Sequence, residues 1–337
     1  MTVNVTKSSF NFREKLKELE RPIGLKGNEL MRAETAQDAR DLVSAGRKNT
    51  IINGNFDVWQ RGTSISGNQH TYGADRWQGY GYSGSSMTMS RQTFSAAEQE
   101  KFGSRYYCRI TETNDRCWFT QLIEDPIQFI GNFVTVSFWA KTSDLVGVEM
   151  QIEFRFYDAA ANKVYSADSY QSYTPEFDEV YTSEWKKYTY TVYVPPTSSW
   201  SGTTTDTEVR LTVTTPNSNP GSIDFANVQV ELGKNATEFE HRSYGEELAL
   251  CQRYYQKSDT LTPGPWFYDA RLGASYYRTT VFFPTEMRDT PTVTWSVNGS
   301  LGATYGTQFI TRKSFTPYTN TGSNSLYITS WTAEKEL

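Results

Sequence analysis

The sequence lacks long apolar runs, so it predicts neither a membrane span nor a secretory signal. No stretch approaches the roughly 18 apolar residues of a membrane-spanning helix. The opening residues, MTVNVTKSSFNF, do not contain the apolar core that a secretory signal needs. We therefore expect no membrane insertion, and synthesis in the cytoplasm.

Residues that carry out catalysis are also scarce. The chain has only two histidines, His70 in NQHTYG and His241 in EFEHRS, and neither stands beside a Gly-x-Ser-x-Gly turn. The glycines of GYGYSG lack the lysine of a phosphate-binding loop, and no Cys/His cluster has zinc spacing. Acidic pairs such as Glu124-Asp125 are unavoidable among 38 acids and only weakly indicate a glycosidase. We therefore predict that the protein is not an enzyme.

Cysteine is rare as well. The three cysteines, Cys108, Cys117 and Cys251, do not form a metal-binding pattern. Cys108 and Cys117 could face each other across a hairpin that turns at Asn114-Asp115, but buried free thiols are the usual state in a reducing compartment. We expect free thiols at these two positions.

The chain has no concentrated basic region. Its net charge is −5, and residues 1–48 carry ten Lys/Arg against seven Asp/Glu, so the remainder is more acidic. Proteins that bind nucleic acid usually present a clustered basic surface. We therefore expect no nucleic-acid partner.

Aromatic residues, by contrast, make up 15% of the chain and include 22 tyrosines. From Asn49 onward they occur in stretches of alternating apolar and polar residues, such as NFVTVSFWAK (132–141) and EMQIEFRFYD (149–158), which are typical of strands. Roughly nine such stretches, with no convincing helix between them, predict a β-sandwich over residues 49–242.

Residues 1–48 have a different pattern, which predicts two short helices. Asn11 stands three residues before Glu14, a capping-box spacing, and a second helix is expected from Thr35 to Gly46. Each would be only about three turns long, so each needs a partner surface. That partner is another copy of the chain, a larger assembly or the body of this chain. The apolar residues that would make the contact are Phe12, Leu16, Leu19, Leu42 and Val43.

Two further segments follow the sandwich. Ser243 and Glu246 have a second capping-box spacing and predict a linker helix over residues 243–257, running through about Tyr255. Alternating stretches then predict a smaller β domain of five or six strands over residues 258–337. Large aliphatic residues are few there, so we expect this domain to share a core with its neighbours.

Several aromatic residues lie in stretches rich in Gly and Ser instead of strand interiors. Flat aromatic faces stack on sugar rings, with polar neighbours fixing the orientation. We predict Tyr80, Tyr82 and Trp200 as glycan-binding residues, and we expect Trp77 to be a core residue instead.

Three stretches carry a resemblance to a known class of domain: INGNFDVWQRG (51–61), YGADRWQ (72–78) and IDFANVQVELG (223–233). Together they resemble the jelly-roll carbohydrate-binding modules, over about residues 49–240. The resemblance implies that INGNFDVWQRG is the first strand of the sandwich. It also implies that Asp57 and Asp224, on the first and last strands, can share a structural calcium ion, although two carboxylates supply only part of the six to eight oxygens that calcium takes.

The run CQRYYQKS (251–258) and the opening NFREKLKELERPIGLKGNELMRAETAQDARDLVSAGRKN extend the resemblance to bacteriophage tail fibres. It implies a virion protein, mainly β, that forms a homotrimer, attaches through residues 1–48 to a tail adaptor, nozzle or capsid protein, and recognises a host-surface glycan. Two alternatives stay open. One is a capsid head fibre or decoration protein with the same sandwich, and the other is a polysaccharide depolymerase.

Overall fold

The computed structural model separates the chain into two compact units, residues 1–48 and 49–337. The structure describes residues 48–68, 70–81, 86–112, 116–142, 149–157, 163–168, 183–199, 206–214, 221–258, 268–269, 277–298, 304–320 and 327–337. The two helices expected in the first unit lie outside the described residues, as do Phe12, Leu16, Leu19, Leu42 and Val43.

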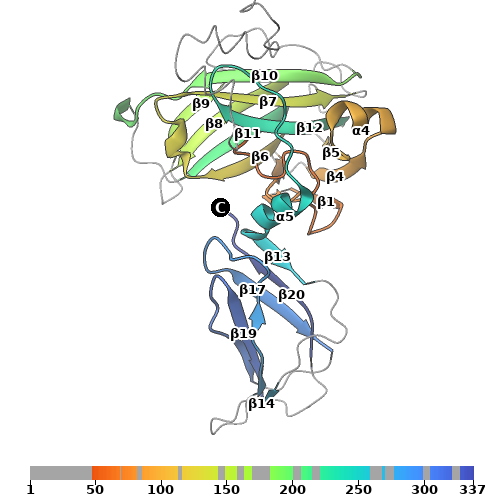
Figure 1. Ribbon diagram of the computed structural model, residues 1–337, viewed down its shortest axis with the longest axis vertical. Helices are drawn as coiled ribbons and strands as arrows, with labels where there is room; N and C mark the ends of the chain where they lie inside the picture. Colours follow the sequence, from red (N-terminus) through yellow and green to blue (C-terminus); the bar gives the residue numbers. More distant parts are fainter. Residues whose placement is uncertain are drawn as a thin grey trace, which may run out of the picture. The chain divides into compact units, whose positions relative to one another are not determined.

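Two six-stranded antiparallel sheets form the sandwich (Figure 1). Most of their strands lie close to the alternating stretches that the sequence predicted. In spatial order, sheet A consists of β1 (Ser64–Gly67), β4 (Met87–Thr93), β5 (Tyr106–Glu112), β12 (Gly221–Leu232), β7 (Phe133–Lys141) and β10 (Lys186–Tyr193). Sheet B consists of β2 (Thr71–Tyr72), β3 (Gln78–Gly81), β6 (Arg116–Glu124), β11 (Asp206–Thr214), β8 (Glu149–Tyr157) and β9 (Lys163–Asp168).

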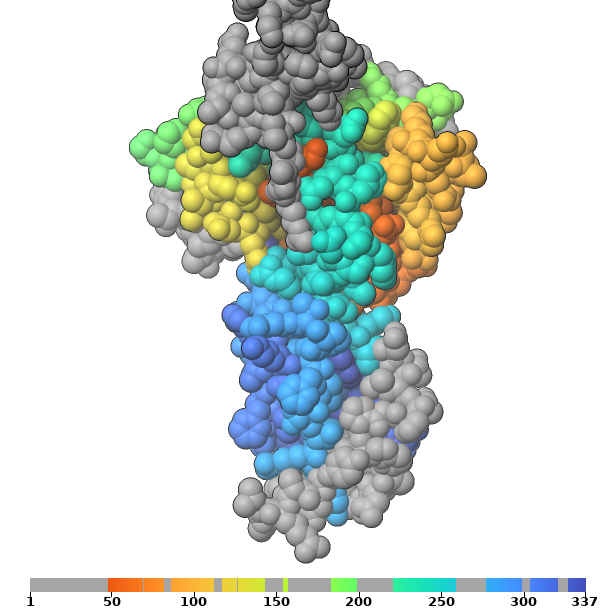
Figure 2. All heavy atoms as spheres, viewed as in Figure 1, coloured from red at the N-terminus to blue at the C-terminus, as the bar shows by residue number. Residues whose placement is uncertain are grey.

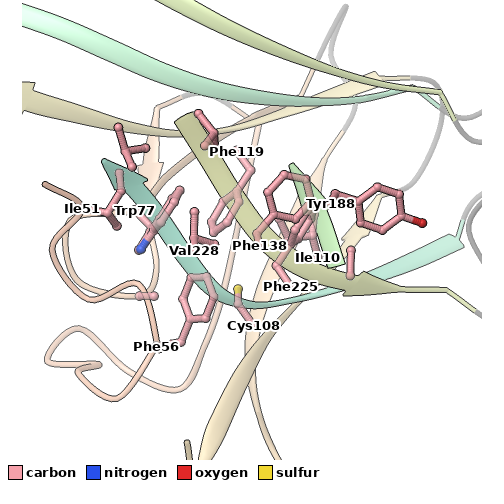
Figure 3. Close-up of a cluster of buried hydrophobic side chains, with 14 of the residues drawn as sticks. Ile51, Phe56, Trp77, Cys108, Ile110, Phe119, Phe138, Tyr188, Phe225 and Val228 are labelled. Atoms are coloured by element: carbon pink, nitrogen blue, oxygen red, sulfur yellow. The ribbon is translucent and has the colours of Figure 1, made fainter. Parts of the chain in front are cut away.

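The two sheets enclose one aromatic core (Figure 3). Trp77 is fully buried and stacks on Phe119 of β6 with ring centroids 4.3 Å apart. Phe119 in turn stacks on Phe225 of sheet A at 5.6 Å, so the rings connect the two layers. The prediction that Trp77 is a core residue is therefore confirmed.

Residues 51–61 were predicted as the first strand, and this prediction is wrong: they form a loop without regular pairing that packs into the core. Asn53 and Phe56 both have φ of 58°, which a strand does not allow. The Asn53 amide group donates to Val58 O at 2.8 Å and to Asp75 O at 3.0 Å, and its oxygen accepts from Val58 N at 3.0 Å. The side chain of Asn53 therefore takes the place of strand pairing.

Gly54 is required where this loop meets β12. Its oxygen accepts from Val228 N at 2.9 Å, and a Cβ at Gly54 would lie 2.1 Å from Val228 O. β12 has a bulge between Ala226 and Gln229, with Asn227 at φ 49°, and this bulge receives the loop. Asn53 is therefore needed for its side-chain hydrogen bonds, and Gly54 is needed because the backbone of β12 comes too close for a Cβ.

The sandwich contains a helix that the sequence analysis did not predict. α4 (Ala96–Phe102) begins at Ser95, whose side chain and that of Glu98 form a complete capping box, and ends at Gly103 in the left-handed region. Two 3₁₀ turns, η2 (Pro126–Phe129) and η3 (Thr197–Ser199), complete the sandwich as far as the structure describes it. No helix of the described residues is long and apolar enough to cross a membrane.

The predicted linker helix is shorter than expected. α5 (Tyr244–Gln252) begins with the predicted capping box of Ser243 and Glu246, but it ends at Gln252. Residues Tyr255–Lys257 form β13 instead, because they pair with β20 near the chain end.

The described part of residues 258–337 has seven strands, more than the five or six predicted, and β13 pairs with them from the preceding segment. One sheet has the order β13, β20 (Ile328–Glu334) and β17 (Thr292–Val297). The other strands are β14 (Tyr268–Asp269), β15 (Tyr277–Arg278), β19 (Ser314–Thr319), β16 (Val281–Phe282) and β18 (Tyr305–Gln308). They enclose a separate, smaller core that includes Phe283, Phe315 and Trp331.

A buried arginine joins this domain to the sandwich. The side chain of Arg76 is only 1% exposed, and its guanidinium lies over the Tyr254 ring, 3.5 Å from the centroid. It is paired with Glu336 and donates to Leu122 O of β6 at 2.6 Å. Arg61 contacts the same carboxylate at 3.0 Å, so two cations of the sandwich bind one acid from the last residues of the chain.

The three cysteines are free and buried. Burial raises the pKa of the Cys108 and Cys251 thiols well above the ordinary range. The predicted free thiols at Cys108 and Cys117 are confirmed.

Replacement of Gly54 by alanine should destabilise the sandwich, because the new Cβ would overlap a backbone oxygen that cannot move aside. We expect a loss of at least about 1–3 kcal/mol in the free energy of unfolding, measured by chemical denaturation. Gly245→Ala in α5 is the matched control, because that Cβ would meet no atom within 4 Å and alanine favours helix. Equal stabilities of the two variants would contradict the close approach at Gly54.

Replacement of Glu336 by glutamine should leave the buried Arg76 charge without its anion. Breaking a buried ion pair costs about 3–5 kcal/mol, so we expect a marked fall in the melting temperature. Glu334→Gln is the control, because the Glu334 side chain is 47% exposed and its pair with Arg61 should contribute less than about 1 kcal/mol. If both variants melt at the same temperature, Arg76 does not depend on Glu336.

Candidate functional site

The outer face of sheet A is largely occupied by the protein itself. α4 packs there through Phe102, which with Phe94 and Tyr107 forms a satellite core. Trp139 of β7 and Trp185 pack against this cluster, and Trp185 Nε1 donates to Glu98 Oε1 at 2.8 Å. These aromatic residues therefore have a structural role.

The segment that follows β12 packs on the same face. In Figure 2 it belongs to the turquoise part of the surface, together with β12 and α5. Glu231 of β12 accepts from Thr237 N at 2.8 Å, and Gln229 Oε1 accepts from Glu240 N at 2.8 Å. Thr135 and Ser137 of β7 alternate with core residues yet are buried as well. The outer face of sheet B is therefore the better candidate for a binding surface.

The alternation of buried residues defines the outer face of sheet B. Phe119 of β6 and Phe154 and Phe156 of β8 are fully buried in the core between the sheets. Because successive strand residues point to opposite faces, Trp118 of β6 and Arg155 of β8 belong to the outer face. Both are partly exposed.

Aromatic rings gather on this face. Tyr80 of β3 pairs directly with Trp118 of β6, and the two ring centroids lie 4.8 Å apart with 35° between the ring planes. His70 lies on the other side of Tyr80, with centroids 5.2 Å apart. Its Nδ1 is 3.0 Å from Gln78 Oε1, which holds the imidazole beside the tyrosine. The three rings therefore form a continuous aromatic row.

A polar atom without a partner lies in the neighbouring position. Thr120 pairs with Gln78 and is only 3% exposed, yet its Oγ1 has no hydrogen-bond partner. Buried hydroxyls normally find one, because an unmet hydrogen bond is costly. By register, Thr120 is on the same face as Tyr80 and Trp118. A buried water molecule at this position would satisfy it.

Of the three predicted glycan-binding residues, the structure describes only one. Tyr80 is on the outer face of sheet B, whereas Tyr82 and Trp200 lie outside the described residues. Trp118 was missed because it stands inside an alternating stretch, where tryptophan is usually a core residue. Its position between Cys117 and Phe119, both on the inner face, is the signal that could have identified it.

The two residues predicted to bind calcium have separate partners. Arg109 donates to both carboxylate oxygens of Asp224, at 2.7 and 2.9 Å. Asp57 accepts from Asn55 Nδ2 at 2.7 Å; burial raises the pKa of its carboxyl, against the opposing effect of Arg105 and Asn55. The described residues contain no group of three or more His, Cys, Asp or Glu that could hold a metal ion. A shared calcium ion stays a prediction.

Glu124, the first acid of the pair Glu124-Asp125, is held by two arginines. Glu124 accepts from Arg288 at 2.6 Å and from Arg253 at 3.1 Å. Burial acts to raise the pKa of this carboxyl, but the two arginines outweigh it and lower the pKa. A glycosidase acid needs a raised pKa. Glu124 instead connects the sandwich to the C-terminal domain.

Comparison with known proteins shows no family. No protein-family model matches the chain, and no curated protein matches its sequence. Solved structures of β-sandwich proteins resemble it only distantly. One is the enzymatically active domain of tailspike protein 4 from bacteriophage CBA120, with 18% identity and a TM-score of 0.34 over 55% of this chain and 21% of that chain.

Two further solved structures match about the same share of the chain. A family 61 carbohydrate-binding module in complex with β-1,4-galactotriose has 11% identity and a TM-score of 0.30 over 56% of this chain and 100% of that chain. A cyclase from Fischerella sp. TAU, bound to 4-(1H-indol-3-yl)butan-2-one, has 14% identity and a TM-score of 0.36 over 57% of this chain and 100% of that chain. These proteins have different functions, so the site of this chain has to be judged from its own residues.

Proposed function

We propose that the sandwich is a carbohydrate-binding module whose ligand lies on the outer face of sheet B. The observation that carries this proposal is the aromatic row of His70, Tyr80 and Trp118 on a partly exposed sheet face. Sugar rings have apolar faces that stack on tyrosine and tryptophan, and their hydroxyls need polar neighbours. Gln78, which is partly exposed beside the rings, supplies such a neighbour.

A second pair of exposed aromatic rings fits a sugar less well. Phe133 of β7 and Tyr193 of β10 lie at 5.1 Å between centroids, and Tyr193 is 45% exposed. Lys234 Nζ lies 4.5 Å from the Phe133 ring centroid, so part of that ring face is already in contact with a cation of the chain. This pair serves below as a control for general aromatic exposure.

We further propose that the sandwich is the jelly-roll module of a bacteriophage tail fibre. The support is the resemblance of INGNFDVWQRG, YGADRWQ and the CQRYYQKS run to such proteins. In this proposal the protein is a homotrimer located in the virion and is not an enzyme. Residues 1–48 attach it to a tail adaptor or nozzle protein, and the sandwich recognises a glycan on the host surface.

Replacement of Trp118 by alanine should weaken glycan binding at least about tenfold, since stacking on one large ring contributes on the order of 1–3 kcal/mol. Tyr80→Ala should also weaken glycan binding. Binding can be measured by titration calorimetry with oligosaccharides chosen from a glycan array, with thermal melting to verify folding.

Tyr193→Ala is the matched control for these variants, because it removes an exposed ring from sheet A and should leave binding unchanged. If Trp118→Ala and Tyr80→Ala both bind like the unaltered protein, the ligand does not lie on sheet B.

Assembly provides a separate test of the fibre proposal. We expect the full chain to have three times the monomer mass in light scattering at micromolar concentration, because virion fibres close their interfaces by cyclic symmetry. Phage particles should lose the protein when residues 1–48 are deleted. A stable monomer, or particles that retain the shortened chain, would contradict the attachment role. Capture of a major capsid protein by residues 1–48 would indicate a head fibre instead.

A further inference from the structure

His70 lies at the end of the aromatic row, at the edge of sheet B. It directly precedes β2, the outermost strand of this sheet among the described residues, and Thr71 of β2 pairs with Gly79 of β3. Continued by one residue, this register places His70 opposite Tyr80, in agreement with the 5.2 Å between their ring centroids. A ligand that stacks on Tyr80 and Trp118 therefore reaches His70 at the sheet edge.

The backbone of His70 is strained. Its φ is 29°, in the left-handed region that favours glycine and that other residues adopt at a cost in free energy. The side chain is exposed, so packing in a core does not offset this cost. Residues held in such conformations cluster at functional sites. The strain therefore indicates that the imidazole lies beside Tyr80 for a reason other than folding.

One hydrogen bond decides which imidazole nitrogen of His70 carries the proton. Nδ1 lies 3.0 Å from Gln78 Oε1, and an amide oxygen accepts hydrogen bonds but does not donate them. Nδ1–H is therefore the donor, and in a neutral imidazole this leaves Nε2 as an acceptor. No described residue donates to Nε2. Gln78 thus fixes both the orientation of the ring and the polarity of its free nitrogen.

The free end of the Gln78 amide has the opposite polarity. Its oxygen is occupied by His70, so its nitrogen presents N–H donors, and no described residue accepts from them. Gln78 pairs with Thr120 of β6 on the face that carries the rings, and its side chain is partly exposed. One acceptor and one donor group therefore lie next to each other at the end of the aromatic row.

From this arrangement we infer that His70 is the specificity-determining residue of the glycan site and that His70 and Gln78 together recognise two adjacent sugar hydroxyls. The inference rests on the proposed glycan-binding function and adds the class of ligand. One hydroxyl donates to His70 Nε2, and its neighbour accepts from the Gln78 amide nitrogen. A site built to bind hydroxyls rejects analogues that lack them, because its own polar groups are then left unpaired. Sugars that are acetylated or methylated at these two positions are therefore excluded.

The experiment uses the full chain at pH 8 with an oligosaccharide identified on a glycan array and with its singly fluorinated analogues. Fluorine in place of a hydroxyl cannot donate a hydrogen bond. We expect one analogue to bind the unaltered protein at least about fivefold more weakly than the parent sugar. His70→Phe keeps a ring beside Tyr80 and should bind the parent more weakly by a similar factor, with no further loss for that analogue.

His241→Phe is the matched control, because it replaces the other exposed histidine, which contacts Phe239 on the segment after β12. It should bind the parent sugar and the analogues like the unaltered protein.

Gln78 variants test the positioning role. Gln78→Met removes the acceptor for Nδ1–H, so the imidazole can take either tautomer and the preference for the parent over the sensitive analogue should narrow. Gln78→Glu supplies an acceptor again and should restore that preference, although not the affinity that the amide N–H contributes. Equal preference in both variants would show that Gln78 does not position His70.

His70→Gly separates binding from stability. Glycine relieves the strain at φ 29°, so the melting temperature should not fall, whereas binding of the parent sugar should weaken at least about fivefold. A lower melting temperature with unchanged binding would show that His70 has a structural role and would overturn the inference.

The outcomes separate the inference from the function on which it rests. If every analogue binds the unaltered protein and His70→Phe in the same ratio, while Trp118→Ala still loses binding, His70 is not the specificity residue and the sheet B site stays in place. If no oligosaccharide binds in a way that depends on Trp118, the proposed function itself fails and the inference fails with it.

Discussion

The burial of the Arg76 charge is the constraint on which the arrangement of the described structure depends. A guanidinium that is only 1% exposed needs an anion, and Glu336 supplies it from the other end of the chain. Arg76 also holds Leu122 O of β6, and its ring partner Tyr254 follows α5 directly. One interaction therefore ties a loop of the sandwich, sheet B and the last residues of the C-terminal domain together.

The two outer faces of the sandwich differ in what their aromatic residues contact. Sheet A uses its aromatic residues for packing: Trp139 and Trp185 contact the α4 cluster, and Gln229 and Glu231 bind the segment after β12. Exposed rings on sheet B have no comparable covering helix in the described residues. A preformed surface of this kind loses little conformational entropy when it binds a rigid ring, which favours recognition without large rearrangement.

Local signals in the sequence were read with mixed success. The capping box of Ser243 and Glu246 marked the start of α5 correctly, because both groups act within one helical turn. Ser95 and Glu98 have the same spacing and mark α4, which the strand pattern around it concealed. The end of α5 could not be read, because it is set by the pairing of Tyr255 with a residue near the chain end.

The sequence by itself determined the mainly β architecture, since strand alternation is a local property with a period of two residues. It also determined that Tyr80 is an aromatic residue away from the core. Only the tertiary structure decided that residues 51–61 form a loop, because the bulge of β12 and the backbone approach at Gly54 exclude a strand there. Only the tertiary structure paired Tyr80 with Trp118, because which strand lies beside β3 depends on contacts distant in the chain.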